Sequence, residues 1–215
     1  MGTYLREPVN GFTHLAGAIL SFVGLLALVI KTTLTSPTVI DITAVIIFGV
    51  SMILLYSASA TYHLVVSSDK VLKFLRKLDH SMIFILIAGS YTPFCLIALE
   101  EAHGWALFII IYAIAIAGVL FKMLWFKCPR WISTSIYIGM GWMALFIISP
   151  LYNAISPQGV FALALGGVFY TIGGIIYGIK PKCLKFKYLG YHEIFHIFVL
   201  LGSITHFICV FNYVI

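Results

Sequence analysis

Long apolar stretches alternate with short polar connections along the whole of this chain. Seven stretches can be distinguished, at about 10–31, 42–66, 79–99, 104–124, 131–151, 159–179 and 190–213. Most of them are long enough to cross a hydrocarbon core of roughly 30 Å, which requires about 20 apolar residues in a helix. Backbone groups in lipid must be hydrogen-bonded within their own segment, and the alternating pattern of barrel strands is missing, so we predict helices.

The composition points to the same class of protein. Hydrophobic residues make up 62% of the chain and charged residues only 9%, whereas a soluble domain is roughly 45–50% apolar and about 25% charged. No long linker or soluble domain is left between the stretches. We therefore predict one all-α integral membrane domain over residues 1–215, a seven-transmembrane helix bundle. The first stretch is expected to be a span and not a cleaved signal peptide, because it is too long and no small-residue cleavage site follows it.

The basic residues predict the orientation of the bundle, because positively charged connections stay in the cytoplasm. If seven spans alternate in direction, all basic residues except Lys31 lie on one side of the membrane. They are Arg6, Lys70, Lys73, Arg76, Lys77, Lys122, Lys127, Arg130, Lys180, Lys182, Lys185 and Lys187. The other side carries Asp41, Glu100 and Glu101. We expect a cytoplasmic N-terminus and an outer C-terminus. The net charge of +6 then reflects topology and contact with anionic lipid, not nucleic-acid binding.

Polar residues inside the spans indicate where a functional site lies, because ionisable groups are expensive in lipid. The second stretch ends with Ser59 and His63, and the seventh begins with His192 and His196. Each pair is four residues apart and therefore shares a helix face. Asp79 begins the third stretch. The predicted topology brings these five residues to one layer near the cytoplasmic side.

The chemistry of this layer predicts a zinc site. Two histidines at positions i and i+4 can bind one metal ion, and three histidines with one water form the open site of a catalytic zinc. We predict that His63, His192 and His196 are the ligands, because imidazole-rich ligation favours zinc over magnesium or calcium. Asp79 is either a fourth ligand or the group that holds the water. Ser59 would hydrogen-bond to Asp79 or to a substrate oxygen.

Other readings remain open for the neighbouring polar residues. Asp79 could simply cap the third helix, and Ser59 could be a small packing residue. Glu193 could orient a ligand or face lipid headgroups. His80 should face away from the site, and His206 should lie roughly 15 Å deeper. At the start of the first stretch, three residues at the predicted level of the site could support the ligands from behind, namely Glu7, Asn10 and His14.

Taken together, these motifs resemble those of bacterial hemolysin III proteins, within the progestin and adipoQ receptor superfamily. The resemblance covers essentially the whole chain and rests on Glu7-Pro8-Val9-Asn10-Gly11-Phe12-Thr13-His14, Ser59-x-x-x-His63, Leu78-Asp79-His80, Gly89-Ser90-Tyr91-Thr92-Pro93-Phe94 and His192-x-x-x-His196. It implies a bacterial plasma-membrane protein with an intramembrane zinc on His63, His192 and His196. It also implies that Asp79 lies near the zinc-bound water. The superfamily is similar to alkaline ceramidases, which hydrolyse lipid amides.

These observations lead to competing functional hypotheses. The first is a zinc-dependent hydrolase of lipid amides or esters, with Asp79 and Ser59 as catalytic residues and a role in membrane lipid homeostasis. The second is a non-enzymatic receptor or homeostasis factor with structural zinc. A pore-forming hemolysin is disfavoured, because a secreted toxin needs a signal peptide and a soluble form. The expected partners are membrane lipids and a lipid substrate or ligand within the bundle, without nucleic acid, and the sequence does not predict an oligomeric state.

Overall fold

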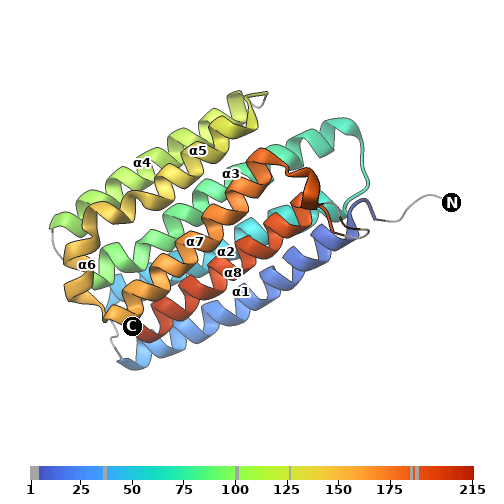
Figure 1. Ribbon diagram of the computed structural model, residues 1–215. Helices are drawn as coiled ribbons and strands as arrows, with labels where there is room; N and C mark the ends of the chain where they lie inside the picture. Colours follow the sequence, from blue (N-terminus) through green and yellow to red (C-terminus); the bar gives the residue numbers. More distant parts are fainter. Residues whose placement is uncertain (1–4, 36–37, 100–101, 126, 185, 187–188) are drawn as a thin grey trace.

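Seven long apolar helical spans form a single bundle in the computed structural model (Figure 1), as the apolar stretches predict. The structure describes the chain except residues 1–4, 36–37, 100–101, 126, 185 and 187–188. The α-helices are α1 (Pro8–Thr35), α2 (Val39–Leu64), α3 (Asp69–Pro93), α4 (Ala102–Leu124), α5 (Arg130–Gly141), α6 (Ile148–Ala154), α7 (Pro157–Ile179) and α8 (Tyr191–Tyr213). The described residues contain no strand.

Two of the spans contain irregular turns. In the third span, α3 ends at Pro93 and continues as a π-helical turn, η1 (Phe94–Ala98). The change follows because proline lacks the N–H that an α-helix needs. The fifth span consists of α5, a 3-10 segment η2 (Trp142–Ile147) and α6. A third irregular turn, η3 (Lys182–Leu184), lies between α7 and α8.

The third helix begins earlier than the apolar stretch indicates. Its N-cap is Ser68 and its first residue is Asp69, whereas we expected the span to begin at 79. The extra turns have the polar and apolar spacing of an amphipathic helix, so the helix extends beyond the apolar stretch. Asp79 therefore lies inside the helix, and the interpretation of Asp79 as a helix cap is wrong.

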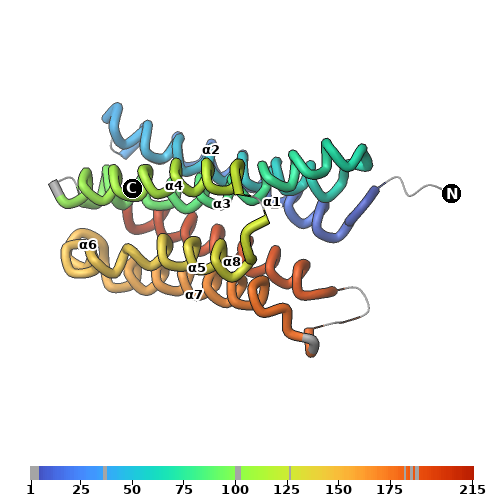
Figure 2. The backbone as a smooth tube through the Cα atoms, turned by 90° about the horizontal axis from the view of Figure 1, so that it is seen from above, coloured from blue at the N-terminus to red at the C-terminus, as the bar shows by residue number. Residues whose placement is uncertain are grey.

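Six helices enclose the centre of the bundle. Contacts join α1 to α2, α2 to α3, α3 to α5, α5 to α7, α7 to α8, and α8 back to α1. The remaining long helix, α4, packs against α3 from outside this ring. Figure 2 shows α2 on one side of α3 and α7 on the other. The arrangement brings α1, α2 and α8, which are far apart in sequence, to one common interior.

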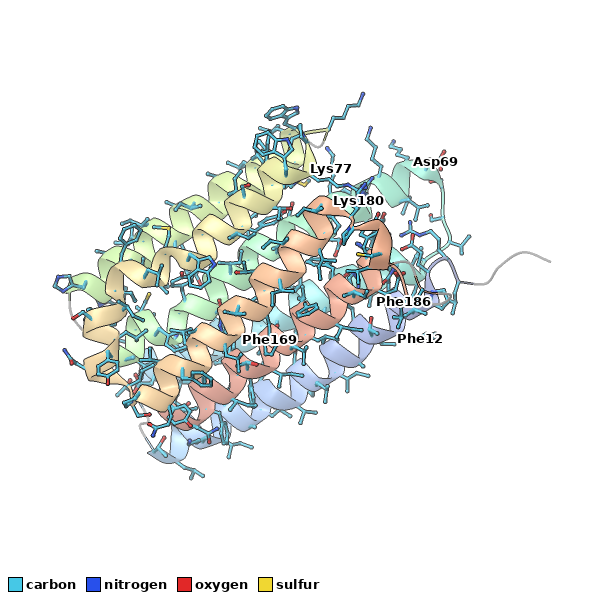
Figure 3. The ribbon with its side chains drawn as sticks, viewed as in Figure 1. Phe12, Asp69, Lys77, Phe169, Lys180 and Phe186 are labelled. Carbon is cyan, nitrogen blue, oxygen red and sulfur yellow. The ribbon has the colours of Figure 1, made fainter. Side chains whose placement is uncertain are left out.

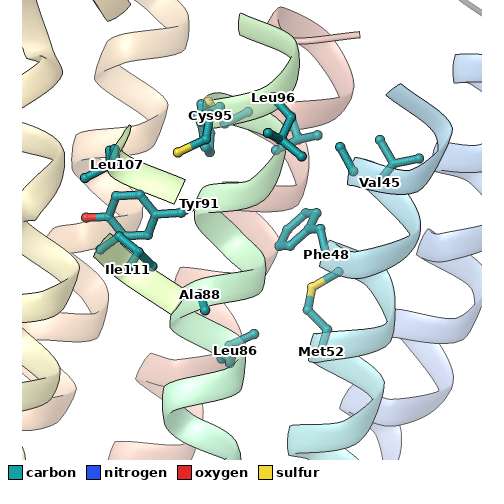
Figure 4. Close-up of a cluster of buried hydrophobic side chains, with 14 of the residues drawn as sticks. Val45, Phe48, Met52, Leu86, Ala88, Tyr91, Cys95, Leu96, Leu107 and Ile111 are labelled. Carbon is teal, nitrogen blue, oxygen red and sulfur yellow. The ribbon is translucent and has the colours of Figure 1, made fainter. Parts of the chain in front are cut away.

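Apolar side chains fill the interface between α2, α3 and α4. Phe48 and Met52 of α2 lie opposite α3, and Ile111 of α4 packs near Tyr91 (Figure 4). The close approach of α2 and α3 requires Gly89, because a Cβ atom there would lie 2.1 Å from the Ser51 hydroxyl oxygen. This half of the bundle is densely packed, and it supports the opposite half, where a cavity lies.

The outer surface of the spans is apolar, as lipid contact requires. Leu20, Ile30, Ile109 and Ile116 are among the large side chains that are about 60% exposed. The two termini lie at opposite ends of the bundle (Figure 1).

The basic end of the bundle is the one that holds the N-terminus, and Figure 3 shows Lys77 and Lys180 there. Of the charged residues used to predict the orientation, Lys185, Lys187, Glu100 and Glu101 lie outside the described residues. Which end faces the cytoplasm remains a prediction.

Candidate metal centre

Three histidines from two distant helices meet near the N-terminal end of the bundle. His63 is on the last turn of α2, and His192 and His196 are on the first turns of α8. One nitrogen atom of each lies within 4.8 Å of the others. Among the described residues, this group of closely spaced donors consists of these three histidines and does not include Asp79. The structure thus brings together the predicted ligands, while Asp79 stands beside them.

A carboxylate fixes the orientation of the His63 ring. The Nδ1 atom of His63 lies 2.6 Å from Oε2 of Glu7, and the backbone N–H of Glu7 donates to the His63 carbonyl at 3.0 Å. The hydrogen bond with His63 lowers the pKa of Glu7 to about 2, so the carboxylate is ionised at neutral pH and acts as an acceptor. Nδ1 of His63 therefore carries the proton. The lone pair of Nε2 points away from Glu7 and is available as a ligand.

The spacing of the donor atoms fits a tetrahedral metal. Nε2 of His63 and Nε2 of His192 are 3.4 Å apart. Two nitrogens bound to one zinc at 2.0–2.1 Å with tetrahedral angles would be separated by about 3.4 Å. His196 contributes one ring nitrogen to the same group. Three imidazole nitrogens at this spacing suit a zinc ion, so the residues present fit the metal that the resemblance implies.

The start of α1 also connects α2 to α8. Asn10 is 2% exposed, and its amide donates to Oε1 of Glu193 at 2.9 Å. The other oxygen of Glu193 accepts the Gly190 backbone N–H at 2.8 Å and so caps α8. Glu193 therefore holds the helix that carries His192 and His196, and Glu193 is not itself a member of the donor group. Glu7 contacts His63 directly, and Asn10 contacts the first turn of α8 through Glu193; that they support a metal site stays a prediction.

His14 of α1 stacks directly on one ligand. The ring centroids of His14 and His196 are 3.7 Å apart, with 13° between the planes. The edge of His14 also faces the ring of Tyr56 at a centroid distance of 5.0 Å. Both ring nitrogens of His14 are buried. His14 thus adds a fourth imidazole to the layer, in contact with the three-histidine group.

A cavity of about 120 Å³ opens beside the histidines. Each of the six ring helices contributes to its wall, including His14, Ser59, Asp79, His192 and His196. Most of the remaining wall consists of apolar and aromatic side chains from α3, α5, α7 and α8. The polar layer therefore forms one part of a cavity whose other walls suit hydrocarbon.

Asp79 and Ser59 are both buried in the wall of this cavity. Asp79 is 8% exposed, and its Oδ2 atom lies 3.4 Å from Nδ1 of His80. The Ser59 hydroxyl is 1% exposed and lies within hydrogen-bonding reach of the Asp79 carboxylate. A carboxylate and a neighbouring hydroxyl thus face the same space as His192 and His196.

His80 was missed by the sequence reasoning. We expected it to face away from the site, but it lines the cavity and its Nε2 atom lies 3.0 Å from the hydroxyl of Tyr177 on α7. His80 is offset from Asp79 by about 100° around α3. The cavity extends far enough around this helix for both side chains to line it. The basic end of α7 carries no polar motif that would have identified Tyr177. His206 is buried further along α8, where its Nε2 atom donates to the Leu163 carbonyl at 3.2 Å.

The comparison with known proteins agrees with the motifs. Residues 3–207 match the family described as Haemolysin-III related. The chain belongs to this family. It is 40% identical to Hemolysin-3 of Bacillus cereus over 216 residues, covering all of this chain and 95% of that protein. It is 38% identical to the Hemolysin-3 homolog of Bacillus subtilis (strain 168), covering 99% and 96% of the two chains.

A more distant relative links the haemolysin III family to animal proteins. Monocyte to macrophage differentiation factor of Homo sapiens is 24% identical over 178 residues, which cover 78% of this chain and 68% of the human protein. This similarity agrees with the progestin and adipoQ receptor superfamily that the motifs indicate. The chain is a multi-pass protein of the bacterial plasma membrane, as its seven apolar helices and its Bacillus relatives indicate. It carries a histidine group that could hold a metal ion.

Proposed function

We propose that this protein is a zinc-dependent hydrolase of lipid amides or esters. The observation that carries the proposal is the position of His192 and His196, which belong to the donor group and also line the apolar cavity. A substrate carbonyl in the cavity would therefore lie beside the metal, with hydrocarbon in the rest of the space. This combination suits a lipid better than a water-soluble substrate.

The metal would be held by His63, His192 and His196. When bound there, zinc supplies a Lewis acid that polarises a carbonyl and lowers the pKa of a bound water. Glu7 holds His63 in the tautomer that leaves Nε2 free for the metal. Asn10 and Glu193 keep the first turn of α8 in place.

Asp79 and Ser59 would act on water and substrate. The Asp79 carboxylate, buried beside the ligands, can accept a proton from the attacking water as a general base. It can then return that proton to the leaving amine or alcohol. The Ser59 hydroxyl lies in the same cavity wall, within reach of Asp79, where it would orient this carboxylate or donate a hydrogen bond to a substrate oxygen.

The first experiment tests the metal site. His192→Ala and His196→Ala proteins would be purified in detergent and their zinc content measured by inductively coupled plasma mass spectrometry. We expect wild-type protein to hold zinc and both variants to lose it. His103→Ala is the matched control, because His103 is exposed and is not a member of the donor group. Unchanged zinc content in the two site variants would overturn the assignment of the ligands.

The second experiment tests the reaction. Lipid extracts would be compared between cells that express the wild-type protein and cells that express the His196→Ala or Asp79→Asn protein. We expect an amide- or ester-linked lipid to accumulate in both variants, and its free fatty acid to fall. The purified wild-type protein should then hydrolyse that lipid. If no lipid class depends on the intact site, the hydrolase proposal fails.

A structural zinc is the second candidate function, and it is suggested by a fourth imidazole beside the donor group, since His14 stacks on His196 without belonging to that group. A structural site usually has four protein ligands, so closure of the site would require the His14 ring to turn toward the metal. His14→Phe keeps an aromatic ring at this position but removes the nitrogens. If His14 closes the site, this variant should lose zinc almost as completely as His196→Ala. If the fourth position is open for water, its zinc content should stay close to that of wild type.

A further inference from the structure

A second cavity adjoins the cavity beside the histidines, further along the bundle. This second cavity has a volume of about 70 Å³ and lies further from the basic end. The two share lining residues at one level, namely Ser90, Tyr91, Gly141, Trp142, Gly167 and His206. We call this level the junction. The two cavities therefore lie end to end across the junction, and we call the line from the histidine layer to the far end of the second cavity the path.

The path follows one face of α7. In order from the histidine end, its wall on this helix includes Tyr177, Gly174, Thr171, Gly167, Ala164 and Val160. From Tyr177 to Gly167 the helix rises by about 15 Å, and from Gly167 to Val160 by about 10 Å more. The full path is thus longer than half of a hydrocarbon core of roughly 30 Å. It has the length and lining for one extended acyl chain.

Gly167 leaves the junction open. A Cβ atom at this position would have no heavy atom within 4 Å. The space that a side chain would occupy is therefore empty, and no neighbouring group packs against Gly167. By contrast, a Cβ atom on the neighbouring Gly166 would lie 2.2 Å from the His206 ring. The two adjacent glycines therefore have different roles: Gly166 allows α7 and α8 to approach, and Gly167 keeps the path continuous.

The opposite wall of the junction is held in place by hydrogen bonds. The hydroxyl of Tyr91 accepts the Ala144 backbone N–H at 2.8 Å and donates to the Gly141 carbonyl at 2.6 Å. The Trp142 indole N–H donates to Thr171 of α7 at 2.9 Å. The irregular segment η2 is thereby fixed against α3 and α7. The width of the junction is set by the fold and does not depend on a freely moving side chain.

We propose that Gly167 determines the longest acyl chain that the protein accepts. The carbonyl end of the chain lies at the histidine layer, and the methyl end passes Gly167 into the second cavity. This inference rests on the proposed function, because it takes the occupant to be the acyl part of the hydrolysed lipid. A side chain at position 167 would stop the methyl end at the junction, so that chains reaching only this level would still bind.

The test measures binding of free fatty acids, so that it does not depend on hydrolysis. Full-length protein in detergent would be incubated with an equimolar series from octanoic to stearic acid, and the bound acids identified by native mass spectrometry. We expect wild type to retain the longest acids. In Gly167→Leu they should be reduced roughly tenfold relative to the shorter acids, because the leucine side chain would occupy the space that the longer chains need; tenfold corresponds to about 1.4 kcal/mol of binding free energy.

Two further variants make the result specific. In Gly139→Leu the Cβ atom also has no neighbour within 4 Å, but Gly139 lines neither cavity, so this control should bind like wild type. Ala164 lines only the second cavity, so Ala164→Leu should stop the chain about 4.5 Å further on and allow an intermediate length. If Gly167→Leu does not fold, Ala164→Leu still tests whether a larger side chain on this face of α7 shortens the acids that bind.

The outcomes separate this inference from the proposed function. A shift to shorter acids in Gly167→Leu, with an intermediate limit in Ala164→Leu, supports the inference even if no hydrolysis is found. If wild type binds no fatty acid, or if Gly167→Leu and Ala164→Leu bind the same lengths as Gly139→Leu, the inference is overturned. Hydrolysis of a lipid by wild type would leave the proposed function standing in that case.

Discussion

His63 and Glu7 are joined by a hydrogen bond of 2.6 Å between Nδ1 and Oε2, across 56 positions of sequence. The bond links the end of α2 to the residue that precedes α1. It fixes which nitrogen of His63 carries the proton and which one faces His192. A metal-binding histidine commonly donates its other N–H to a carboxylate in this way, and loss of such a partner weakens metal affinity.

The first prediction follows from this contact. Glu7→Ala should lower zinc affinity roughly 10- to 100-fold without abolishing binding, because the three ligands remain. Competition between the purified protein and a chromophoric chelator measures the change. Arg6→Gln is the control, since Arg6 contacts the other oxygen of Glu7 at 3.3 Å and leaves the bond to His63 in place. Equal zinc affinities for Glu7→Ala and wild type would show that the carboxylate does not support the site.

The histidine group shows which parts of a membrane site sequence reasoning can reach. His192 and His196 could be paired from their spacing, because an interval of four residues fixes a common helix face. His63 could be added because the basic connections predicted its level in the membrane. A helix period and a topology therefore sufficed to predict that three histidines from two helices come together.

Features that depend on tertiary packing were not predictable in this way. The cavity wall comes from six helices, and no local pattern indicates that Gly167 opens a path while Gly166 allows close packing. His80 was excluded from its helix angle alone, although Tyr177 of α7 approaches it from another side. The start of α3 at Asp69 was missed because its first turns are polar. An apolar stretch marks the part of a helix in lipid, not the whole helix.

A second prediction concerns Asp79, which the proposed function makes the general base. Asp79→Asn should retain zinc, because Asp79 is not part of the donor group. It should slow lipid hydrolysis about 10²- to 10⁴-fold, as expected when a positioned base is lost. The rate of fatty-acid release and the zinc content would be measured on the same preparation.

Asp69→Asn is the matched control for this experiment. Asp69 is an exposed residue in the first turn of α3, so its loss should leave both hydrolysis and zinc content close to wild type. Loss of zinc in Asp79→Asn would indicate that Asp79 supports the metal directly. Unchanged hydrolysis in this variant would remove Asp79 from the mechanism.

A third prediction concerns the break between α5 and η2. Tyr91→Phe removes the hydroxyl that accepts the Ala144 N–H and donates to the Gly141 carbonyl. We expect a loss of about 1 kcal/mol in the free energy of unfolding, because hydrogen bonds within membrane proteins have modest net values. Unfolding in mixed detergent micelles provides the measurement.

Tyr112→Phe serves for comparison with Tyr91→Phe. The hydroxyl of Tyr112 contacts a side chain, the Thr92 hydroxyl at 2.9 Å, and no backbone group of an irregular segment. Its removal should destabilise the protein less than removal of the Tyr91 hydroxyl. Equal stabilities for Tyr91→Phe and wild type would indicate that the Tyr91 hydroxyl does not stabilise η2.

A fourth prediction tests the orientation that the basic residues indicate. Cys183 is exposed in η3, between α7 and α8 at the basic end, whereas Cys95, Cys128 and Cys209 are buried. If that end faces the cytoplasm, a membrane-impermeant maleimide should label the protein in inverted membrane vesicles and not in intact spheroplasts. Cys183→Ser should abolish this labelling, which attributes it to one residue. Labelling of Cys183 in intact spheroplasts would reverse the orientation, and would place the histidine layer nearer the outer surface of the membrane.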